Sequence, residues 1–531
     1  MSRPLVAPPY AATPWDRVLN EANGTQAALP TGDRLLPGDW LPALREWHGL
    51  LKERDGAVPS RPAAYLVGGV LRDALLGRAP VDIDVTLAHA EPVEPARVLA
   101  GMVRGTAVVL DPERRMVRVA AARLQPPHLD LTPLRGAILA DLQGRDFTCN
   151  ALALPLEAAF GADWRDHLID PFGGRADLES RRLRMLRDDV FREDPVRLLR
   201  AARVAAELGL TVEPGTEEAI VRHASALSES SAERVRDELV RLLLVPHAAQ
   251  WLDTLDRWDL LCRVLPELAP GKGVMQPVFH FWDVFQHSLH AVEAIEALLT
   301  QAAALDLVVE PAWRPAIETN LSEELGGGRP RLASLKLATL LHDVGKPKTK
   351  TVEPDGRTRF FGHAERGAAM AAQAMERLRF SRREIEAVQL LIREHLRPTM
   401  MGRPPSERAL YRFFRDLGEE AYALLLLHVA DARATHGPSL DGQAWRDFLR
   451  GVGDILRWRF VPPRMEAPRR LIDGHTLMAA LNLPPGPQIG RLLEAIDEAY
   501  ALSQVHTAEE ALRYVAGLVH REPVVAGQET Q

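Results

Sequence analysis

The sequence predicts an α+β protein, in which a small mixed domain of strands and helices precedes a long, entirely helical region. Between residues 61 and 176, short apolar runs alternate with turns, a pattern typical of strands. From Asp177 onward, apolar residues recur at helical spacing, for example at Leu239, Leu242 and Leu243. The 531 residues are enough for three or four domains. An apolar content of 46% with only 6% aromatic residues suits helices with aliphatic cores.

The bulk composition indicates a cytoplasmic protein without a membrane partner. No apolar run reaches the length of a membrane span, and the first residues lack the apolar segment of a signal peptide. Cys149 and Cys262 are too few for a disulfide framework or a cysteine-based zinc site. The net charge of −7 argues against a uniformly basic nucleic-acid binder. Arginines nevertheless crowd residues 181–203, and such a patch can follow phosphates on an acidic chain.

Two aspartates one residue apart form the first candidate site. If residues 81–87 form a strand, Asp82 and Asp84 point to the same face and into one cleft. Two carboxylates in a cleft can bind two Mg²⁺ ions against a triphosphate. The alternative for this pair alone is a solvated acidic strand end.

A glycine pair and an arginine just upstream strengthen the case for a nucleotide site. Gly68 and Gly69 follow an apolar run over residues 63–67 that reads as a buried strand. Glycines allow the backbone to approach phosphates closely. Arg72 falls in the first turn of an expected helix, where a guanidinium can bind a phosphate through two hydrogen bonds. The combination favours a site for nucleotidyl transfer over an ordinary turn.

Further polar residues extend this candidate site. Asp130 lies in an alternating strand and could supply a third carboxylate, or could be an ordinary acid at a strand end. Arg145, Asp146 and Asn150 precede an apolar stretch and could contact ribose and phosphate. Alternatively, Asp146 could cap a helix.

Asp194 and Arg197 suggest a way to recognise a base. Residues three apart share a helix face, so we expect this carboxylate and guanidinium to lie side by side. An acceptor beside a donor can read the Watson–Crick edge of a base. An ordinary intrahelical ion pair is the alternative.

These motifs occur together in an order that resembles the class II tRNA nucleotidyltransferases, the CCA-adding family. This family shares its catalytic core with bacterial poly(A) polymerases, and the resemblance extends over about residues 60–515. It implies that Asp82 and Asp84 bind metal and that Asp194 with Arg197 selects C or A without a nucleic-acid template. It further implies that the nucleotide is bound by Gly69, Arg72, Arg145, Arg197 and Arg200. The implied partners are tRNA, CTP and, in some members, ATP.

The chain departs from the family pattern before the Asp-Phe-Thr motif. Gly144 replaces the first of two arginines that are usual there, and only residues 136–144 separate Arg135 from Arg145. Complete CCA-adding enzymes usually have a longer flexible loop here, which lets the pocket switch from C to A. Enzymes that add only two cytidines typically lack that loop, so the resemblance favours a CC-adding enzyme. The alternatives are a complete CCA-adding or an A-adding enzyme, a poly(A) polymerase, and a hydrolase whose head only binds RNA.

The helical region contains a second candidate metal site. Its histidines and aspartates occur in the order typical of an HD-domain phosphohydrolase: His287, His342, Asp343, His363, His395 and Asp431. Imidazole and carboxylate ligands suit a divalent transition metal or Mg²⁺. The resemblance implies one or two metals that activate water, with phosphate esters such as 2′,3′-cyclic phosphates as substrates. This domain could clean damaged tRNA 3′ ends before nucleotide addition; a helical scaffold with a vestigial site is the alternative.

Together the two resemblances imply a domain order. It is an N-terminal extension (1–60), a nucleotidyltransferase head (61–176), a helical RNA-binding neck (177–265), an HD domain (280–440) and a C-terminal tRNA-binding tail (465–520).

Overall fold

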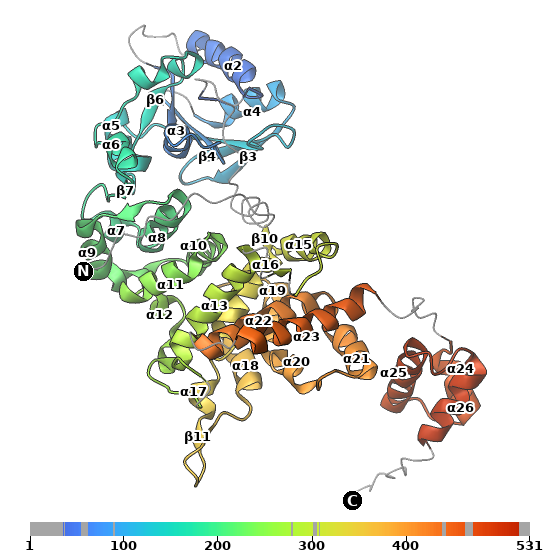
Figure 1. The fold of residues 1–531 in the computed structure, drawn as a ribbon. Coiled ribbons are helices and arrows are strands. Elements are labelled where there is room, and N and C mark those ends of the chain that lie inside the picture. Colours follow the sequence, from blue (N-terminus) through green and yellow to red (C-terminus); the bar gives the residue numbers. More distant parts are fainter. Residues whose placement is uncertain are drawn as a thin grey trace, which may run out of the picture.

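The expected α+β class is confirmed by a computed structural model, in which a mixed sheet with its helices precedes a long helical body (Figure 1). The structure describes residues 35–36, 38–54, 62–88, 91–277, 280–300, 305–306, 308–437, 442–461 and 471–519. Most of the expected N-terminal extension therefore lies outside the described residues. None of the described helices is long and apolar enough to cross a membrane.

A six-stranded sheet with the strand order β3-β4-β5-β2-β1-β6 forms the centre of the head. β2 and β5 run parallel, and all other neighbours run antiparallel. β3 and β4 form a hairpin on either side of residues 112–115. The strands are β1 (Ala64–Val67), β2 (Ile83–Leu87), β3 (Thr106–Asp111), β4 (Met116–Ala120), β5 (His128–Pro133) and β6 (Ala153–Pro155).

Short helices surround this sheet. They are α2 (Leu41–Arg54), α3 (Gly69–Leu75), α4 (Val93–Met102), α5 (Ile138–Gln143), α6 (Gly174–Glu179) and the 3-10 turns η1 (Thr148–Asn150), η2 (Ala158–Phe160) and η3 (Trp164–His167). α3 packs on β1 and β2, α4 packs on β3 and β4, and α2 packs on α4. The buried indoles of Trp40 and Trp47 donate to the carbonyls of Pro126 and Pro95, both at 2.9 Å. These contacts attach the N-terminal helix firmly to the head.

The first group of body helices follows the head directly. It comprises α7 (Val190–Glu193), α8 (Arg197–Leu208), α9 (Pro214–His223), η4 (Ala224–Glu229), α10 (Ala232–Leu244), α11 (Ala248–Arg257), α12 (Leu261–Val264) and η5 (Pro266–Gly271). A short parallel pair, β7 (Arg182–Leu183) with β8 (Thr211–Val212), links its start to α9. Helices α8, α10 and α11 pack on one another and carry the apolar faces that the helical spacing predicted.

The remaining helices form a larger bundle and a separate tail (Figure 1). The bundle contains α13 (Val284–Thr300), α15 (Arg314–Ser322), α16 (Arg331–Leu341), α17 (Lys346–Thr349), α18 (His363–Arg377), α19 (Arg382–Glu394), α20 (Arg397–Met400), α21 (Glu407–Leu417), η6 (Gly418–Glu420), α22 (Ala421–His436) and α23 (Gly442–Phe460). Two small hairpins interrupt it, β9 (Glu324–Gly326) with β10 (Arg329–Pro330) and β11 (Thr351–Val352) with β12 (Thr358–Arg359). The tail consists of α24 (Gly474–Leu481), α25 (Pro487–Ala501) and α26 (Ala508–Val519). One continuous apolar core joins the head to the bundle, whereas the tail has a core of its own.

Candidate functional site

The paired aspartates lie in a pocket of about 390 Å³ that is lined by the head and by helices α8 and α10. Asp84 is on β2 and Asp82 immediately precedes that strand, so the alternation of the strand turns Ile83 into the core and both carboxylates toward the pocket. Burial, and next the neighbouring Asp82, raise the pKa of Asp84 to about 7. Two carboxylates confined in this way are best neutralised by a cation, so their environment fits a divalent metal ion.

A sharp turn between β1 and α3 brings the backbone to the edge of the pocket. Gly68 has φ +67°, and a Cβ there would lie 2.6 Å from Nη1 of Arg145, so only glycine fits. The next residue, Gly69, starts α3 and lies against Asp82. This turn leaves an open cradle beside the paired carboxylates, which suits phosphate groups.

Arg72 projects from α3 into the same pocket. Its Nε donates to Asp73 at 2.8 Å and its Nη1 donates to the side-chain oxygen of Asn150 at 2.8 Å. Its Nη2 also pairs with Asp73 at 2.8 Å, so these contacts hold the guanidinium at the edge of the pocket, where its charge can attract a phosphate.

Asp130 occupies the expected place but already has a partner. It pairs with Asp84 in the register of the parallel strands β2 and β5, so the two side chains share a face. Arg118 on β4 binds both of its oxygens, at 2.8 and 2.7 Å. Among the described residues, Asp82, Asp84 and Asp130 do not gather their ligand atoms within 4.8 Å of one another. A role as third metal ligand therefore stays a prediction, in which Asp130 would bind the ion through lone pairs that Arg118 does not use.

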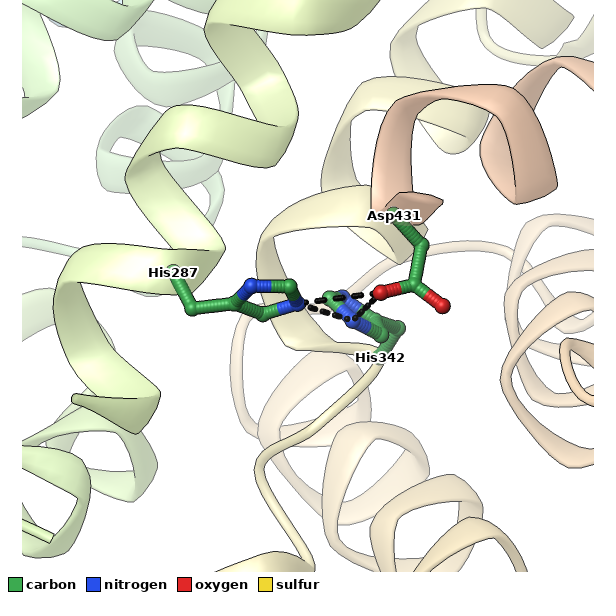
Figure 2. Close-up of side chains that lie close together, drawn as sticks. All are labelled: His287, His342 and Asp431. Atoms are coloured by element: carbon green, nitrogen blue, oxygen red, sulfur yellow. Dashed lines mark hydrogen bonds and ion pairs between the residues drawn. The ribbon is translucent and has the colours of Figure 1, made fainter. Parts of the chain in front are cut away.

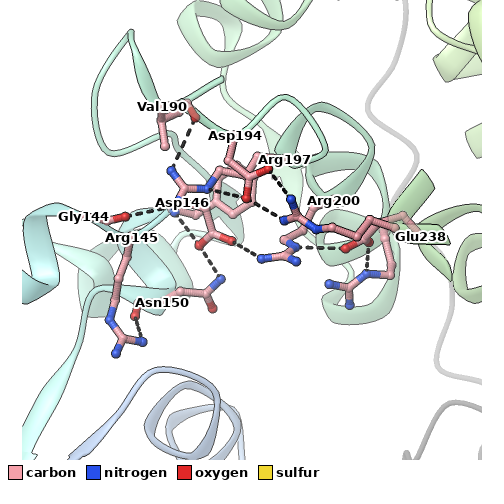
Figure 3. Close-up of polar contacts among 12 residues, drawn as sticks. Gly144, Arg145, Asp146, Asn150, Val190, Asp194, Arg197, Arg200 and Glu238 are labelled. Carbon is pink, nitrogen blue, oxygen red and sulfur yellow. Dashed lines mark hydrogen bonds and ion pairs between the residues drawn. The ribbon is translucent and has the colours of Figure 1, made fainter. Parts of the chain in front are cut away.

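Asp146 is the centre of a polar network that joins the head to α8 (Figure 3). Its carboxylate accepts from the backbone N–H of Phe147 and from the side chain of Asn150, both at 2.8 Å, and from Arg200 at 3.4 Å. Although burial opposes ionisation, Arg200 and the bond from Asn150 keep the pKa of Asp146 below its usual value. Asp146 therefore does not act as a helix cap, since the following turn η1 has no side-chain cap. Arg145 sits beside this network, 3.5 Å from the backbone oxygen of Asn150.

The prediction that Asp194 and Arg197 share a helix face is wrong. Asp194 has extended backbone angles at the end of α7, because Pro195 disfavours a helical residue before it, and Arg197 starts α8. Arg234 of α10 binds both oxygens of Asp194, at 2.9 and 2.6 Å. Nε of Arg197 lies 3.8 Å from Asp194, while Nη2 donates to the carbonyl of Gly144 at 3.0 Å (Figure 3). The two groups are thus neighbours, but a third residue orients the carboxylate.

The arginine-rich segment serves partly as internal structure. Nε of Arg182 and of Arg184 donates to the buried Asp177, at 2.8 and 2.9 Å. Arg200 and Arg203 both bind Glu238 of α10, at 2.9 and 2.5 Å. Many of the arginines expected to follow phosphates therefore form internal ion pairs, which hold α6, α8 and α10 in place.

Sequence reasoning missed part of the pocket wall. Arg78, Arg203, Glu207 and Arg241 also line the pocket, although the motifs do not include them as site residues. Arg203 and Glu207 extend the face of α8 that carries Arg200, at helical spacing. Helical spacing could therefore have predicted that Arg203 and Glu207 lie beside Arg200 on α8. Nothing local in the sequence places Arg241 of α10 at the same pocket.

The six residues of the second candidate site gather into two adjacent groups in the bundle. His287 of α13, His342 at the end of α16 and Asp431 of α22 form the first group (Figure 2). Nε2 of His287 lies 3.2 Å from Nε2 of His342 and 3.1 Å from Asp431. Asp343, His363 and His395 form the second group.

Asp343 lies between the two groups and faces both. One oxygen lies 3.2 Å from His342, and the other lies 3.5 Å from His363 and 3.9 Å from His395. The second oxygen is buried and has no hydrogen-bond partner. An unpaired buried oxygen costs free energy, and a bound cation would remove that cost. Lys346 also donates to Asp343, at 2.5 Å.

The histidines of this cluster are oriented for metal binding. Nδ1 of His342, His363 and His395 donates to the carbonyls three residues earlier, at 2.8, 2.8 and 2.7 Å. Nε2 of each ring therefore faces the cluster, the arrangement found for metal-ligating imidazoles. Burial opposes a charged ring, yet Asp343 and Asp431 raise the pKa of His342 to about 10. The cluster thus demands positive charge, and this donor set fits one or two divalent ions.

Comparison with known proteins agrees with this geometry. Residues 64–184 match the "Poly A polymerase head domain", residues 209–272 match the "Probable RNA and SrmB- binding site of polymerase A", and residues 284–433 match the "HD domain". The A-adding tRNA nucleotidyltransferase of Deinococcus radiodurans is 37% identical over 480 residues, which cover 89% of this chain and 100% of that protein. The chain belongs to the tRNA nucleotidyltransferase family. Another member, the CC-adding tRNA nucleotidyltransferase of Thermus thermophilus, is 36% identical over 459 residues, or 85% of this chain and 93% of that protein.

Solved structures of CCA-adding enzymes share the fold. The Thermotoga maritima CCA-adding enzyme complexed with tRNA aligns with a TM-score of 0.57 at 19% identity, over 91% of this chain and 96% of that one. A CCA-adding enzyme in complex with CTP aligns with a TM-score of 0.58 at 18% identity, over 95% of this chain and 98% of that one.

Proposed function

We propose that this chain adds CMP residues from CTP to the 3′ end of tRNA in the head pocket, without a nucleic-acid template. The observation that carries the proposal is the placement of the Gly68 turn and Arg72 beside two buried carboxylates in one pocket. In the reaction, the RNA 3′-hydroxyl attacks the α-phosphate of CTP and pyrophosphate leaves. Mg²⁺ held by Asp82 and Asp84 would activate the hydroxyl and neutralise the leaving group.

The protein groups of the pocket would divide the remaining tasks. The glycine turn and Arg72 would hold the triphosphate, the turn through backbone groups and Arg72 through its guanidinium. Arg145, Asn150 and Arg200 would position the sugar and phosphates. Arg197 lines the pocket and would donate to the base, while Asp194, which Arg234 orients beside Arg197 outside the pocket lining, would accept from it.

The short segment before Arg145 supports a stop after two cytidines. Residues 134–144 connect the end of β5 to Arg145 and already include the six-residue helix α5, so a long flexible loop has no place here. An A-adding enzyme is the second candidate, favoured by the similarity to the Deinococcus radiodurans protein of that name along its whole length.

We further propose that the HD domain hydrolyses phosphate esters with one or two divalent ions. Asp343 would bridge two groups of ligands, and the metal would supply an activated water. A cavity of about 880 Å³ adjoins the ligands and is lined in part by Lys346, Arg403 and Trp445. Cations and an aromatic ring in one cavity suit a phosphate ester that carries a base.

Two double variants separate the two activities. Asp82→Ala with Asp84→Ala should abolish CMP incorporation and spare hydrolysis of a 2′,3′-cyclic nucleotide. His342→Ala with Asp343→Ala should do the reverse, so each variant serves as the folding control for the other. Incorporation that survives the loss of Asp82 and Asp84 would refute the head assignment, and hydrolysis that survives the loss of His342 and Asp343 would refute the HD assignment.

A further inference from the structure

One end of the head pocket is formed by three arginines around Glu207. Arg78 donates to the backbone oxygen of Glu207 at 2.6 Å, and Arg203 donates to its carboxylate at 2.6 Å. Nη2 of Arg241 forms an ion pair with the other carboxylate oxygen at 3.4 Å, but the two groups are not aligned for a hydrogen bond. All four residues line the pocket that contains Asp82 and Asp84.

Positive charge exceeds negative charge at this end of the pocket. Glu207, Glu238 and Asp146 are the carboxylates that bind its arginines; Glu238 is shared by Arg200 and Arg203, and Asp146 binds Arg200. Arg78 reaches only the backbone of Glu207. Three carboxylates thus accompany the four guanidiniums of Arg78, Arg200, Arg203 and Arg241, so this wall keeps an excess of positive charge that favours an anion.

Arg241 is the cation of this group best placed to bind a ligand. Its side chain is 48% exposed, compared with 8% for Arg203, so it can reach an incoming molecule. Burial, and next the charge of Arg203, lower the pKa of Arg241, although Glu207 and Glu238 oppose this shift, so part of the effect is repulsion from a neighbouring cation. A phosphate would relieve this repulsion and would offer the two acceptors that a guanidinium can bind together.

Two phosphate sources meet in a nucleotidyl-transfer pocket, the triphosphate of CTP and the backbone of the RNA. The guanidinium fixed for the triphosphate is Arg72, which Asp73 and Asn150 hold at the glycine turn. Arg241 instead belongs to α10, within residues 209–272 that match an RNA-binding family model. We propose that Arg241 binds a backbone phosphate next to the 3′ end of the RNA and so directs the terminal hydroxyl toward Asp82 and Asp84. This inference rests on the proposed nucleotidyl transfer.

The test is steady-state CMP incorporation by the full chain carrying Arg241→Ala, with tRNA and CTP varied in turn. For a single strand, each lost phosphate contact reduces the slope of log affinity against log salt by about 0.7. At 0.1 M salt this corresponds to an affinity for RNA that is about fivefold weaker. We therefore expect the KM for tRNA to rise about fivefold, with a shallower salt dependence and an unchanged KM for CTP. Arg241→Lys should recover part of the loss, because it keeps the charge but not the bidentate geometry.

Arg257→Ala is a matched control. Arg257 lies on α11 in the same matched segment, its side chain is 60% exposed and it lies 3.4 Å from Asp253, but it does not line the pocket. It should leave the KM for tRNA and its salt dependence unchanged, and thermal unfolding should show that both variants fold.

Three results would overturn the inference. A rise in the KM for CTP alone would assign Arg241 to the triphosphate, and a changed Mg²⁺ requirement alone would assign it to Asp82. An unchanged KM for tRNA would show that Arg241 does not contact the RNA. All three require a wild-type chain that incorporates CMP, so a wild type without incorporation would instead refute the proposed function.

Discussion

The raised pKa of Asp84 predicts that metal binding in the head depends on pH near neutrality. A carboxyl group with a pKa of about 7 is about 10% ionised at pH 6 and about 90% ionised at pH 8. Because a divalent ion binds the ionised form, protons compete with it increasingly as pH falls through 7. We expect Mn²⁺ to bind the head about tenfold more tightly at pH 8 than at pH 6. A carboxylate with an ordinary pKa would give almost no change over this range.

Mn²⁺ binding followed by electron paramagnetic resonance gives this affinity directly. The chain should carry His342→Ala and Asp343→Ala, so that the second candidate metal site does not contribute. Adding Asp84→Asn to this background is the control, and it should remove the pH dependence together with most of the affinity. An affinity that is equal at pH 6 and pH 8 before Asp84 is changed would refute the reasoning, because it would mean that Asp84 is ionised throughout.

Three other predictions concern base selection, stability and reactivity. Asp194→Ala should reduce the preference for CTP over ATP, measured as the ratio of their kcat/KM values, at least about tenfold, because the base loses a hydrogen-bonding partner. An unchanged ratio would contradict a role of Asp194 in base selection. Asp177→Asn should destabilise the head by about 2–3 kcal/mol in urea unfolding, because the buried carboxylate accepts from Thr148 and two partly exposed arginines. Burial alone would raise the pKa of Asp177, but these hydrogen bonds lower it below its usual value. The loss of stability in the variant should therefore be full at neutral pH and shrink below about pH 4. A variant as stable as the wild type at pH 7 would contradict this prediction. Burial raises the pKa of Cys149 to about 12, so iodoacetamide should label it only after unfolding, and labelling of the folded chain detected by mass spectrometry would argue against that burial.

Local patterns in the sequence were sufficient for the strands and for much of the candidate pocket. Strand alternation around Asp84 and the turn chemistry of Gly68 depend on neighbouring residues, so both could be read directly. The ligands of the HD domain were found because each residue type and their order are distinctive, although their three-dimensional grouping was not visible.

Pairings between distant segments could not be read from the sequence. Arg118 neutralises Asp130 only because β4 and β5 are neighbours in the sheet. Arg234 binds Asp194, and Arg241 joins the pocket, only because α10 packs beside α8. The expected helix face shared by Asp194 and Arg197 failed for a local reason that was present in the sequence, since Pro195 disfavours a helical conformation at Asp194.

Extension of a tRNA that ends at its discriminator base, resolved to single nucleotides, tests the central claim most directly. The reactions contain CTP alone, ATP alone, or both. The account predicts two added residues with CTP and no further addition when ATP is present. A third residue with ATP would make the chain a complete CCA-adding enzyme, and addition only to a tRNA that already ends in CC would make it an A-adding enzyme. Long tails made from ATP, or no extension under any condition, would contradict the account.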